Sequence, residues 1–102
     1  MYNIFTPNLF FEWDEEKNVA NQGKHGVSFQ EARSVFFDDN AREAFDPDHS
    51  EAEDRHVLMG SSDRLRMLFV SFCYRRDYSM IRIISARKLN KMELKKYKRM
   101  FK

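Results

Sequence analysis

Four arginines lie on or beside apolar, strand-like runs in the second half of the chain. They are Arg75, Arg76, Arg82 and Arg87. The guanidinium group is planar, keeps its charge at neutral pH and donates paired hydrogen bonds that match the oxygens of a phosphate. This pattern predicts a site for a polyanion such as nucleic acid. The alternative, an ion pair between each arginine and an acidic side chain of the same chain, stays open.

The charges of the chain are sorted by half. Residues 1–54 hold four of the 18 basic residues and 13 of the 16 acidic ones, whereas residues 55–102 hold the other 14 basic residues and three acidic ones. The net charge of +2 therefore hides a strongly cationic C-terminal half. That half supplies positive charge for a polyanion, and the acidic half supplies ion-pair partners for the same arginines.

The length of 102 residues is enough for one compact domain and too short for two ordinary ones. We expect an irregular leader over residues 1–8 and a single domain over residues 9–102. Cys73 is the only cysteine, so no internal disulfide can form, and its apolar surroundings favour a buried, inert thiol. No apolar run approaches the roughly 20 residues that span a bilayer, so the sequence predicts a soluble, cytoplasmic protein without a membrane partner.

Capping signals divide the chain into helices that must position the arginines. A first short strand over residues 9–13 precedes a helix that we expect to end at Lys24 or His25, before a left-handed Gly26. Two further helices begin with capping-box spacing, and the first of them ends near Phe37. The three expected N-caps are Asp14, Ser28 and Asn90, and the two boxes pair Ser28 with Glu31 and Asn90 with Glu93.

The region between the second and third helices has the composition of strands. The runs over residues 55–60, 65–75 and 79–86 are rich in Val, Ile, Phe, Leu and Met, and a shorter candidate covers residues 42–45. The order predicts a small α+β domain with N-terminal helices packed on one face of an antiparallel sheet and a C-terminal helix. In the longest run, one alternating set of side chains should meet the helices, and the other could line a partly exposed groove near Arg75.

Several motifs of the chain resemble those of the BrnT toxins of type II toxin–antitoxin pairs. The first is Phe11-Glu12-Trp13-Asp14 followed by Lys17, Asn21 and the run from Lys24 to Phe29. The others are Asp48-His49-Ser50 with Glu53 and Arg55, then Gly60, then the run from Arg82 to Arg87 with Glu93 and Tyr97. These motifs keep their order over roughly residues 10–98, which makes the resemblance much more specific than a single motif.

The resemblance implies an endoribonuclease with a RelE-like fold that inhibits translation and arrests growth. It also implies a BrnA-like DNA-binding antitoxin that neutralises the toxin in a heterotetramer, so that operator DNA is bound only through the antitoxin. An acidic or amphipathic antitoxin segment would suit the cationic groove. The residues themselves agree on one cytoplasmic domain, α+β order and a cationic strand region, but they do not distinguish RNA cleavage from RNA binding.

Metal-free cleavage of RNA requires attack of a ribose 2′-oxygen on the adjacent phosphorus. The site must bind the phosphate, neutralise the developing charge and move two protons. Arg82 and Arg87 are the leading candidates for the first two tasks. Because they are five residues apart, ideal alternation puts them on opposite faces, so either the strand ends before Arg87 or only one of them lines the groove. We favour Arg87, and we place Arg55 and Arg75 second.

Proton transfer has several candidates. His49 lies in a polar loop, whereas His25 lies at a helix end where a capping role is the alternative. Lys17 and Lys24 share one helix face and match the resemblance, and a solvated face is their alternative. We expect His56 to be an ordinary surface residue. We also expect no metal and no cofactor, because no Cys and His cluster has zinc spacing and the acidic stretch at residues 46–54 lacks the glycine of a calcium loop.

A noncatalytic module is the alternative class of protein. In that interpretation the lysines of the final helix bind nucleic acid or a protein partner, and the strand-borne arginines are scaffold. Charge and strands are consistent with both classes.

Overall fold

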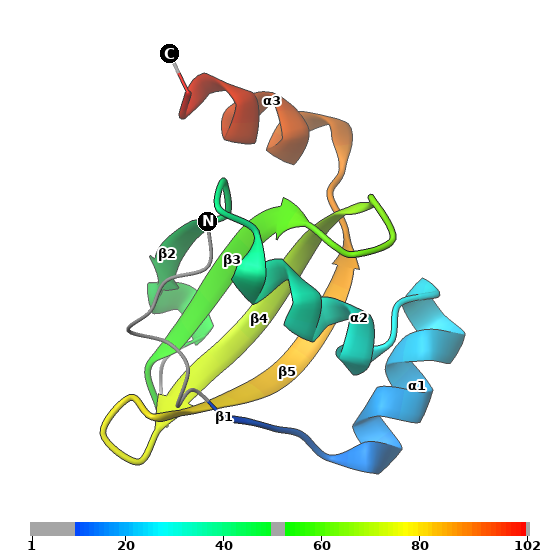
Figure 1. Ribbon diagram of the computed structural model, residues 1–102, viewed down its shortest axis with the longest axis vertical. Coiled ribbons are helices and arrows are strands. Elements are labelled where there is room, and N and C mark those ends of the chain that lie inside the picture. The colour runs from blue at the N-terminus through cyan, green and yellow to red at the C-terminus, as the bar shows by residue number, and fades with distance from the viewer. Residues whose placement is uncertain (1–9, 50–52, 102) are drawn as a thin grey trace.

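A computed structural model describes residues 10–49 and 53–101, apart from the side chain of His49. It is the predicted α+β fold, with one sheet of strand order β1-β5-β4-β3-β2, α2 across one face, α1 beside the edge of β5, and α3 beyond one end (Figure 1). In chain order the elements are β1 Phe10–Glu12, α1 Glu15–His25, α2 Phe29–Ser34, the 3₁₀ turn η1 Val35–Phe37, β2 Arg42–Asp46, the 3₁₀ turn η2 Pro47–His49, β3 Arg55–Ser61, β4 Met67–Arg75, β5 Met80–Lys88 and α3 Lys91–Arg99.

The leader predicted for residues 1–8 lies outside the described residues, and the single domain over residues 9–102 stays a prediction. No helix in the described part of the chain is long and apolar enough to cross a membrane.

The predicted ends of α1 and the predicted start of α3 are confirmed, whereas α2 ends at Ser34 and only the 3₁₀ turn η1 continues to Phe37. The Asp14 side chain accepts hydrogen bonds from the backbone N–H groups of Glu16 and Lys17, and Gly26 ends α1 with a φ of 68°. Asn90 and Glu93 form the complete capping box of α3. The box predicted at the start of α2 is half wrong: Ser28 accepts from the backbone of Glu31, but the Glu31 carboxylate binds other side chains, described below.

The core lies between α2, η1 and the adjacent face of the sheet. Phe29 at the start of α2 is fully buried, as are Leu68, Val70 and Phe72, which alternate along β4. The prediction that one alternating set of β4 side chains meets the helices is therefore confirmed. Each such side chain stabilises the fold by about 1.5–3 kcal/mol through its burial. Cys73, on the other set, is also buried, as predicted.

The edge strand β1 departs from the predicted antiparallel pattern. It pairs in parallel with β5, through Phe10 to Glu12, whereas the pairs among β2, β3, β4 and β5 are antiparallel. Beyond this short strand, Asn21 of α1 takes over the exposed edge of β5. Its amide donates to the carbonyl of Ala86 at 2.8 Å and accepts from the N–H of Ala86 at 3.2 Å. The side chain thus satisfies the backbone groups that a neighbouring strand would bond.

A β-bulge divides β5. Ser85 pairs with Ser71 of β4, but the preceding pair joins Ile83 to Phe72, so Ile84 is an extra residue. The alternation of side chains is therefore reset inside the strand. Ile83 stays in the core, and the bulge changes where the residues after it point.

The ends of β4 and β5 also differ from the predicted runs. β4 begins at Met67, two residues late, because Leu65 occupies a turn with a φ of 59°. β5 continues to Lys88, so the possibility that this strand ends before Arg87 is wrong.

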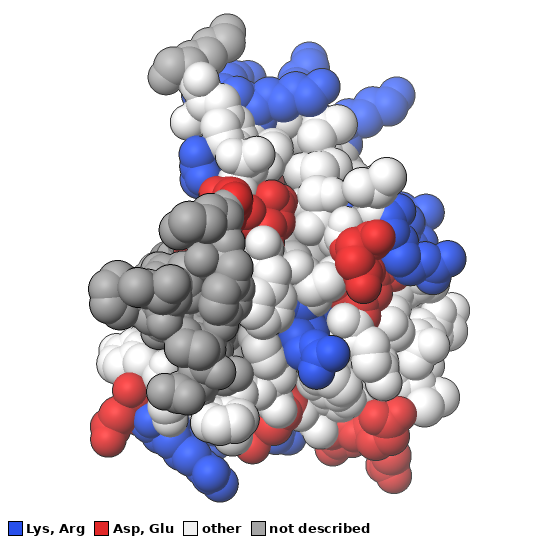
Figure 2. Space-filling model, in the orientation of Figure 1, with Lys and Arg blue, Asp and Glu red and all other residues white. Residues whose placement is uncertain are grey.

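The C-terminal helix α3 makes few contacts with the rest of the fold (Figure 1). Tyr97 is 9% exposed and donates its hydroxyl to the carbonyl of Asn40 at 2.9 Å. Phe101 follows the helix and is 44% exposed, with the guanidinium of Arg42 4.2 Å from its ring centroid. The apolar side of this helix is therefore only partly buried. Lysines and arginines gather over it (Figure 2).

Candidate nucleic-acid interface

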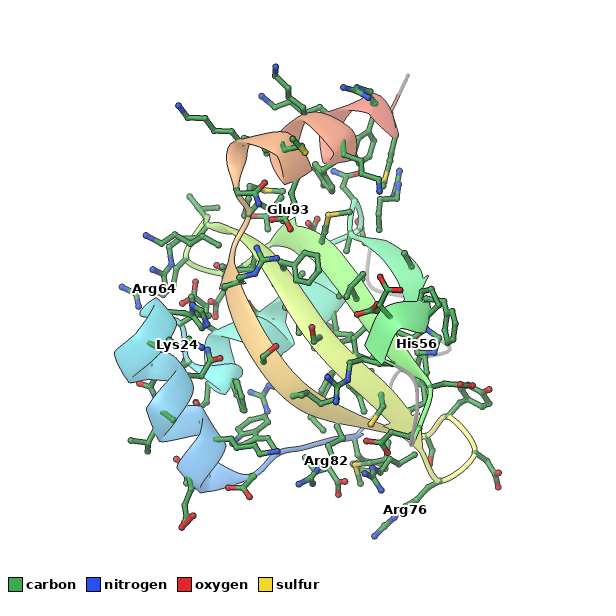
Figure 3. The ribbon with its side chains drawn as sticks, turned by 180° about the vertical axis from the view of Figure 1, so that it is seen from behind. Lys24, His56, Arg64, Arg76, Arg82 and Glu93 are labelled. Atoms are coloured by element: carbon green, nitrogen blue, oxygen red, sulfur yellow. The ribbon has the colours of Figure 1, made fainter. Side chains whose placement is uncertain are left out.

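The face of the sheet opposite α2 carries the strand-borne arginines. We call it the open face. Figure 3 views the molecule from the side opposite to Figure 1, so this face is toward the reader, with Arg82 at the lower end. Arg82 pairs with Cys73 and Arg87 pairs with Phe69, and these partners are four residues apart on β4. Both arginines therefore project from the same face, because the bulge at Ile84 cancels the odd spacing between them. The prediction that they lie on opposite faces is wrong for this reason.

Arg82 belongs to a cluster of charges where β1, β4 and β5 meet. Its guanidinium donates to the Glu12 carboxylate at 3.2 Å, and Arg75 lies 3.8 Å from the same Glu12 oxygen. Arg75 also pairs with Glu53 at 3.0 Å. For these two arginines the ion-pair alternative is confirmed, with partners from the acidic half. All of these side chains are partly exposed, so water and a phosphate can reach them and each pair contributes about 1 kcal/mol or less.

Arg87 is held more rigidly. Both of its terminal nitrogens donate to the Glu93 carboxylate at 2.7 Å, and its guanidinium lies 4.3 Å from the ring centroid of Phe69. The hydrogen bonds from Arg87 hold the pKa of the Glu93 carboxyl below its usual value. The acidic partner comes from α3 and not from the first half of the chain. Glu93 thus orients the arginine and occupies the fork that a phosphate would use.

The other predicted residues lie in three places. Arg55 is the first residue of β3, and alternation with buried Leu58 puts it on the open face. His49 ends η2, and its side chain lies outside the described residues. Lys17, Lys24 and His25 are on α1, beside the edge of β5. Figure 3 shows Lys24 and Arg64 toward the same edge of the molecule. Among the described residues, no three His, Cys, Asp or Glu side chains are grouped as metal ligands.

His56 is not an ordinary surface residue, so that interpretation is wrong. Its Nδ1 lies 3.2 Å from the Glu43 carboxylate, and its ring stacks on Phe72 with 5.7 Å between centroids. Tyr74 donates its hydroxyl to the same carboxylate at 2.9 Å, and burial raises the pKa of this tyrosine. The three polar groups come from three strands, so only the sheet register brings them together. The sequence contains no spacing that would have identified the cluster.

Arg66 forms a further ion pair that the sequence did not indicate. Its guanidinium binds the buried Glu31 carboxylate and donates to the carbonyl of Gly26 at 2.9 Å. Ser62 donates to Glu31 at 2.7 Å. The hydrogen bond from Arg66 lowers the pKa of Glu31. This network joins the ends of both N-terminal helices to the β3–β4 turn, and its burial indicates a structural role.

A family model described as "Ribonuclease toxin, BrnT, of type II toxin-antitoxin system" matches residues 13–93, a segment that contains Arg82, Arg87 and Glu93. The 1.1 Å crystal structure of the Brucella abortus ribonuclease toxin BrnT is similar, with a TM-score of 0.61 and 25% identity over 81% of this chain and 99% of that chain. A search of curated proteins found no match.

The fold and these matches define a ribonuclease toxin of a type II toxin–antitoxin system. The chain belongs to the BrnT family, because the family model covers most of its length. The predicted resemblance is confirmed. Membership implies an RNA target and an antitoxin partner.

Proposed function

We infer that the protein is an endoribonuclease that cleaves RNA without a metal ion on the open face of its sheet. In the cytoplasm this cleavage inhibits translation and arrests growth until an antitoxin binds. The observation that supports this site is the bulge at Ile84, which brings Arg82 and Arg87 to one solvent-accessible face. Two arginines on one face can follow a phosphate backbone, whereas arginines on opposite faces cannot.

The two arginines contact different phosphates in this proposal. Their pairing partners on β4, Cys73 and Phe69, are four residues apart, so the two arginines are separated by about 13 Å along the sheet, since each residue advances a strand by about 3.3 Å. Arg87 binds the phosphate that is cleaved, and Arg82 with Arg75 binds the backbone farther along. RNA phosphate displaces the carboxylates of Glu93 and Glu12 from these guanidinium groups.

The reaction begins when the ribose 2′-oxygen attacks phosphorus and loses its proton. A new 2′-O–P bond forms, the P–O5′ bond breaks, and the leaving 5′-oxygen takes up a proton. The products are a 2′,3′-cyclic phosphate and a 5′-hydroxyl group. The guanidinium of Arg87 neutralises the negative charge that grows on the phosphate oxygens, which is worth a factor of about 100–1,000 for one well-placed donor. We assign proton transfer to His49.

The partner is a BrnA-like antitoxin in a heterotetramer of two toxins and two antitoxins. An acidic or amphipathic segment of it covers the open face and competes with RNA for the arginines. Its DNA-binding part contacts operator DNA, so the toxin does not bind DNA directly.

The decisive experiment is RNA cleavage by purified protein with a chelator present. Wild type should cleave, and Arg87→Ala should cleave about 100–1,000 times more slowly. Arg33→Ala, on the exposed side of α2, is the matched control and should retain the wild-type rate. Loss of wild-type cleavage in the chelator would establish a metal requirement. Folded Arg87→Ala with full activity would remove this residue from the mechanism.

The noncatalytic alternative predicts a different result. RNA binding without cleavage, abolished by substitutions in the Lys-rich α3, would assign function to that helix. Expression of wild type and Arg87→Ala in cells without antitoxin tests the same choice, because only a nuclease that depends on Arg87 loses growth arrest with that substitution.

A further inference from the structure

A cavity of about 260 Å³ lies at the end of β4, beside the β4–β5 turn. Three aromatic rings line it, from His56, Tyr74 and Tyr78. Its volume is slightly below the roughly 300–1,000 Å³ of sites for drug-sized ligands, which suits a single ring system. Of the residues predicted to meet a polyanion, Arg75 and Arg76 line it.

The turn that closes this cavity has an unusual backbone. Arg76, Asp77 and Tyr78 are consecutive and all left-handed, with φ values of 52°, 54° and 71°. Residues other than Gly, Asn and Asp are disfavoured in this left-handed region, and such backbone strain is concentrated at functional sites. Tyr78 nevertheless presents a large ring that is 71% exposed. A structural role does not require an exposed aromatic ring at this position.

The inner wall of the cavity is fixed in advance. Glu43 binds both His56 and the Tyr74 hydroxyl, at 3.2 and 2.9 Å, so neither ring can turn freely. Tyr78 lies with its ring centroid 5.0 Å from that of Tyr74, at an interplanar angle of 52°. An additional planar group can stack on the exposed ring of Tyr78 without ordering the wall first.

The polar groups of the cavity suit a nucleotide. Arg75 and Arg76 supply positive charge, and the carboxylates of Asp54 and Asp77 can accept hydrogen bonds from N–H groups on a base edge. His56 and Tyr74 project from the side of the sheet that packs on α2, because each is two residues from a core side chain, Leu58 or Phe72. Arg75 projects from the open face and lies 3.8 Å from the Glu12 oxygen that Arg82 binds, so it joins the cavity to the open face at the end of the sheet. Figure 3 shows Arg76 and Arg82 at the same end of the sheet.

We propose that this cavity is a stacking subsite for one base of the single-stranded RNA that crosses the open face and passes round the end of β4. The inference rests on the proposed ribonuclease function, and it adds Tyr78 as the residue that contacts one particular base of the bound RNA. Tyr78 stacks on the base, Arg75 and Arg76 hold its phosphate, and the two aspartates favour a base with an amino or imino N–H. Stacking on one aromatic side chain contributes about 5- to 150-fold in affinity.

The test compares 2′-O-methyl oligonucleotides, which cannot be cleaved, with copies that carry one abasic position. For wild type, the dissociation constant should rise at least fivefold when the abasic position falls in the subsite. Tyr78→Asn should remove this difference, and Tyr78→Phe should retain it. Since Asn tolerates a left-handed backbone, Tyr78→Asn should melt no lower than wild type.

Leu65→Asn is the matched control, because Leu65 is also exposed and left-handed, with a φ of 59°, but lies in the turn at the opposite end of β4. It should keep the abasic penalty. Folded Tyr78→Asn that still distinguishes base from abasic position overturns the subsite, as does a wild type that binds both oligonucleotides equally. RNA cleavage by wild type and Arg87→Ala is measured separately. If the abasic penalty is intact but wild type does not cleave RNA, only the nuclease function is rejected. If wild type cleaves RNA but shows no abasic penalty, only the subsite is rejected.

Discussion

Arg82 and Arg87 project from one face of β5 although five residues separate them, because Ile84 is an extra residue in the strand. This relationship determines how the protein can meet RNA. The arginines are too far apart for one phosphate, and each is restrained by a carboxylate on or beside the sheet. The same geometry gives a quantitative expectation for binding.

Arg82→Ala and Arg87→Ala should each reduce the salt dependence of RNA binding. If each arginine contacts its own phosphate, the slope of log Kobs against log salt should become less steep by about 0.7 for each substitution and by about 1.4 for the double variant. Fluorescence anisotropy with a 2′-O-methyl oligonucleotide over a salt series measures this. Arg33→Ala should keep the wild-type slope, and a double variant no different from either single one would mean a shared phosphate.

Glu93→Gln should bind RNA about fivefold more tightly than wild type at low salt, equivalent to ~1 kcal/mol. The reason is that the Glu93 carboxylate competes with phosphate for the Arg87 fork. The glutamine oxygen can still accept from the N–H of Asn90, so the helix cap is retained. Glu16→Gln, in the exposed first turn of α1, controls for the change in net charge. Weaker binding by folded Glu93→Gln would show that Glu93 supports the arginine and does not compete.

Arg66→Ala should lower the free energy of unfolding at pH 7, and by more than the loss of an exposed ion pair does, because it leaves the Glu31 carboxylate buried without its main partner. The pKa of the Glu31 carboxyl is lower in the folded state, so the Arg66–Glu31 pair contributes its full stability above the unfolded pKa of about 4.3. This contribution is lost as the pH falls through the folded pKa. Denaturant titrations at pH 7 and below pH 4 should therefore show a shrinking difference between wild type and variant.

Arg64→Ala controls for that result. Arg64 lies 3.9 Å from the same Glu31 carboxylate but is 70% exposed, so its loss should cost about 1 kcal/mol or less. Equal losses for the two arginines would contradict the structural role given to Arg66.

Gly60→Ala should destabilise the fold by about 1–3 kcal/mol. A Cβ at this position would lie 2.9 Å from the Cβ of Ala41 and 2.9 Å from an Asp38 oxygen, and the same Asp38 oxygen accepts the N–H of Ser61 at 2.7 Å. Gly23→Ala, with open space around it in α1, should instead stabilise by about 0.5–1 kcal/mol. Thermal melts of both variants measure the contrast, and a neutral Gly60→Ala would show that the contact with η1 can relax.

The secondary structure could be predicted largely from the sequence because its signals are local. A cap such as Asp14 or Asn90 acts on backbone groups within three residues, and Gly26 ends its helix through its own φ. Alternation in β4 likewise follows from neighbouring side chains. The arginines on β4 and β5 could be predicted as candidate site residues for the same reason, since the sequence shows each of them within or beside an apolar run.

Only the tertiary structure decided which of those residues share a face and what they bind. The bulge at Ile84 reflects how β5 fits β4, which no spacing within β5 specifies. The partners of Arg82 and His56 come from strands distant in sequence, and parallel pairing of β1 with β5 brings Glu12 to Arg82. By itself, the chain sequence therefore determined the order of elements and the cationic character of its strands. Packing between elements determined the open face, because long-range register depends on the whole sheet.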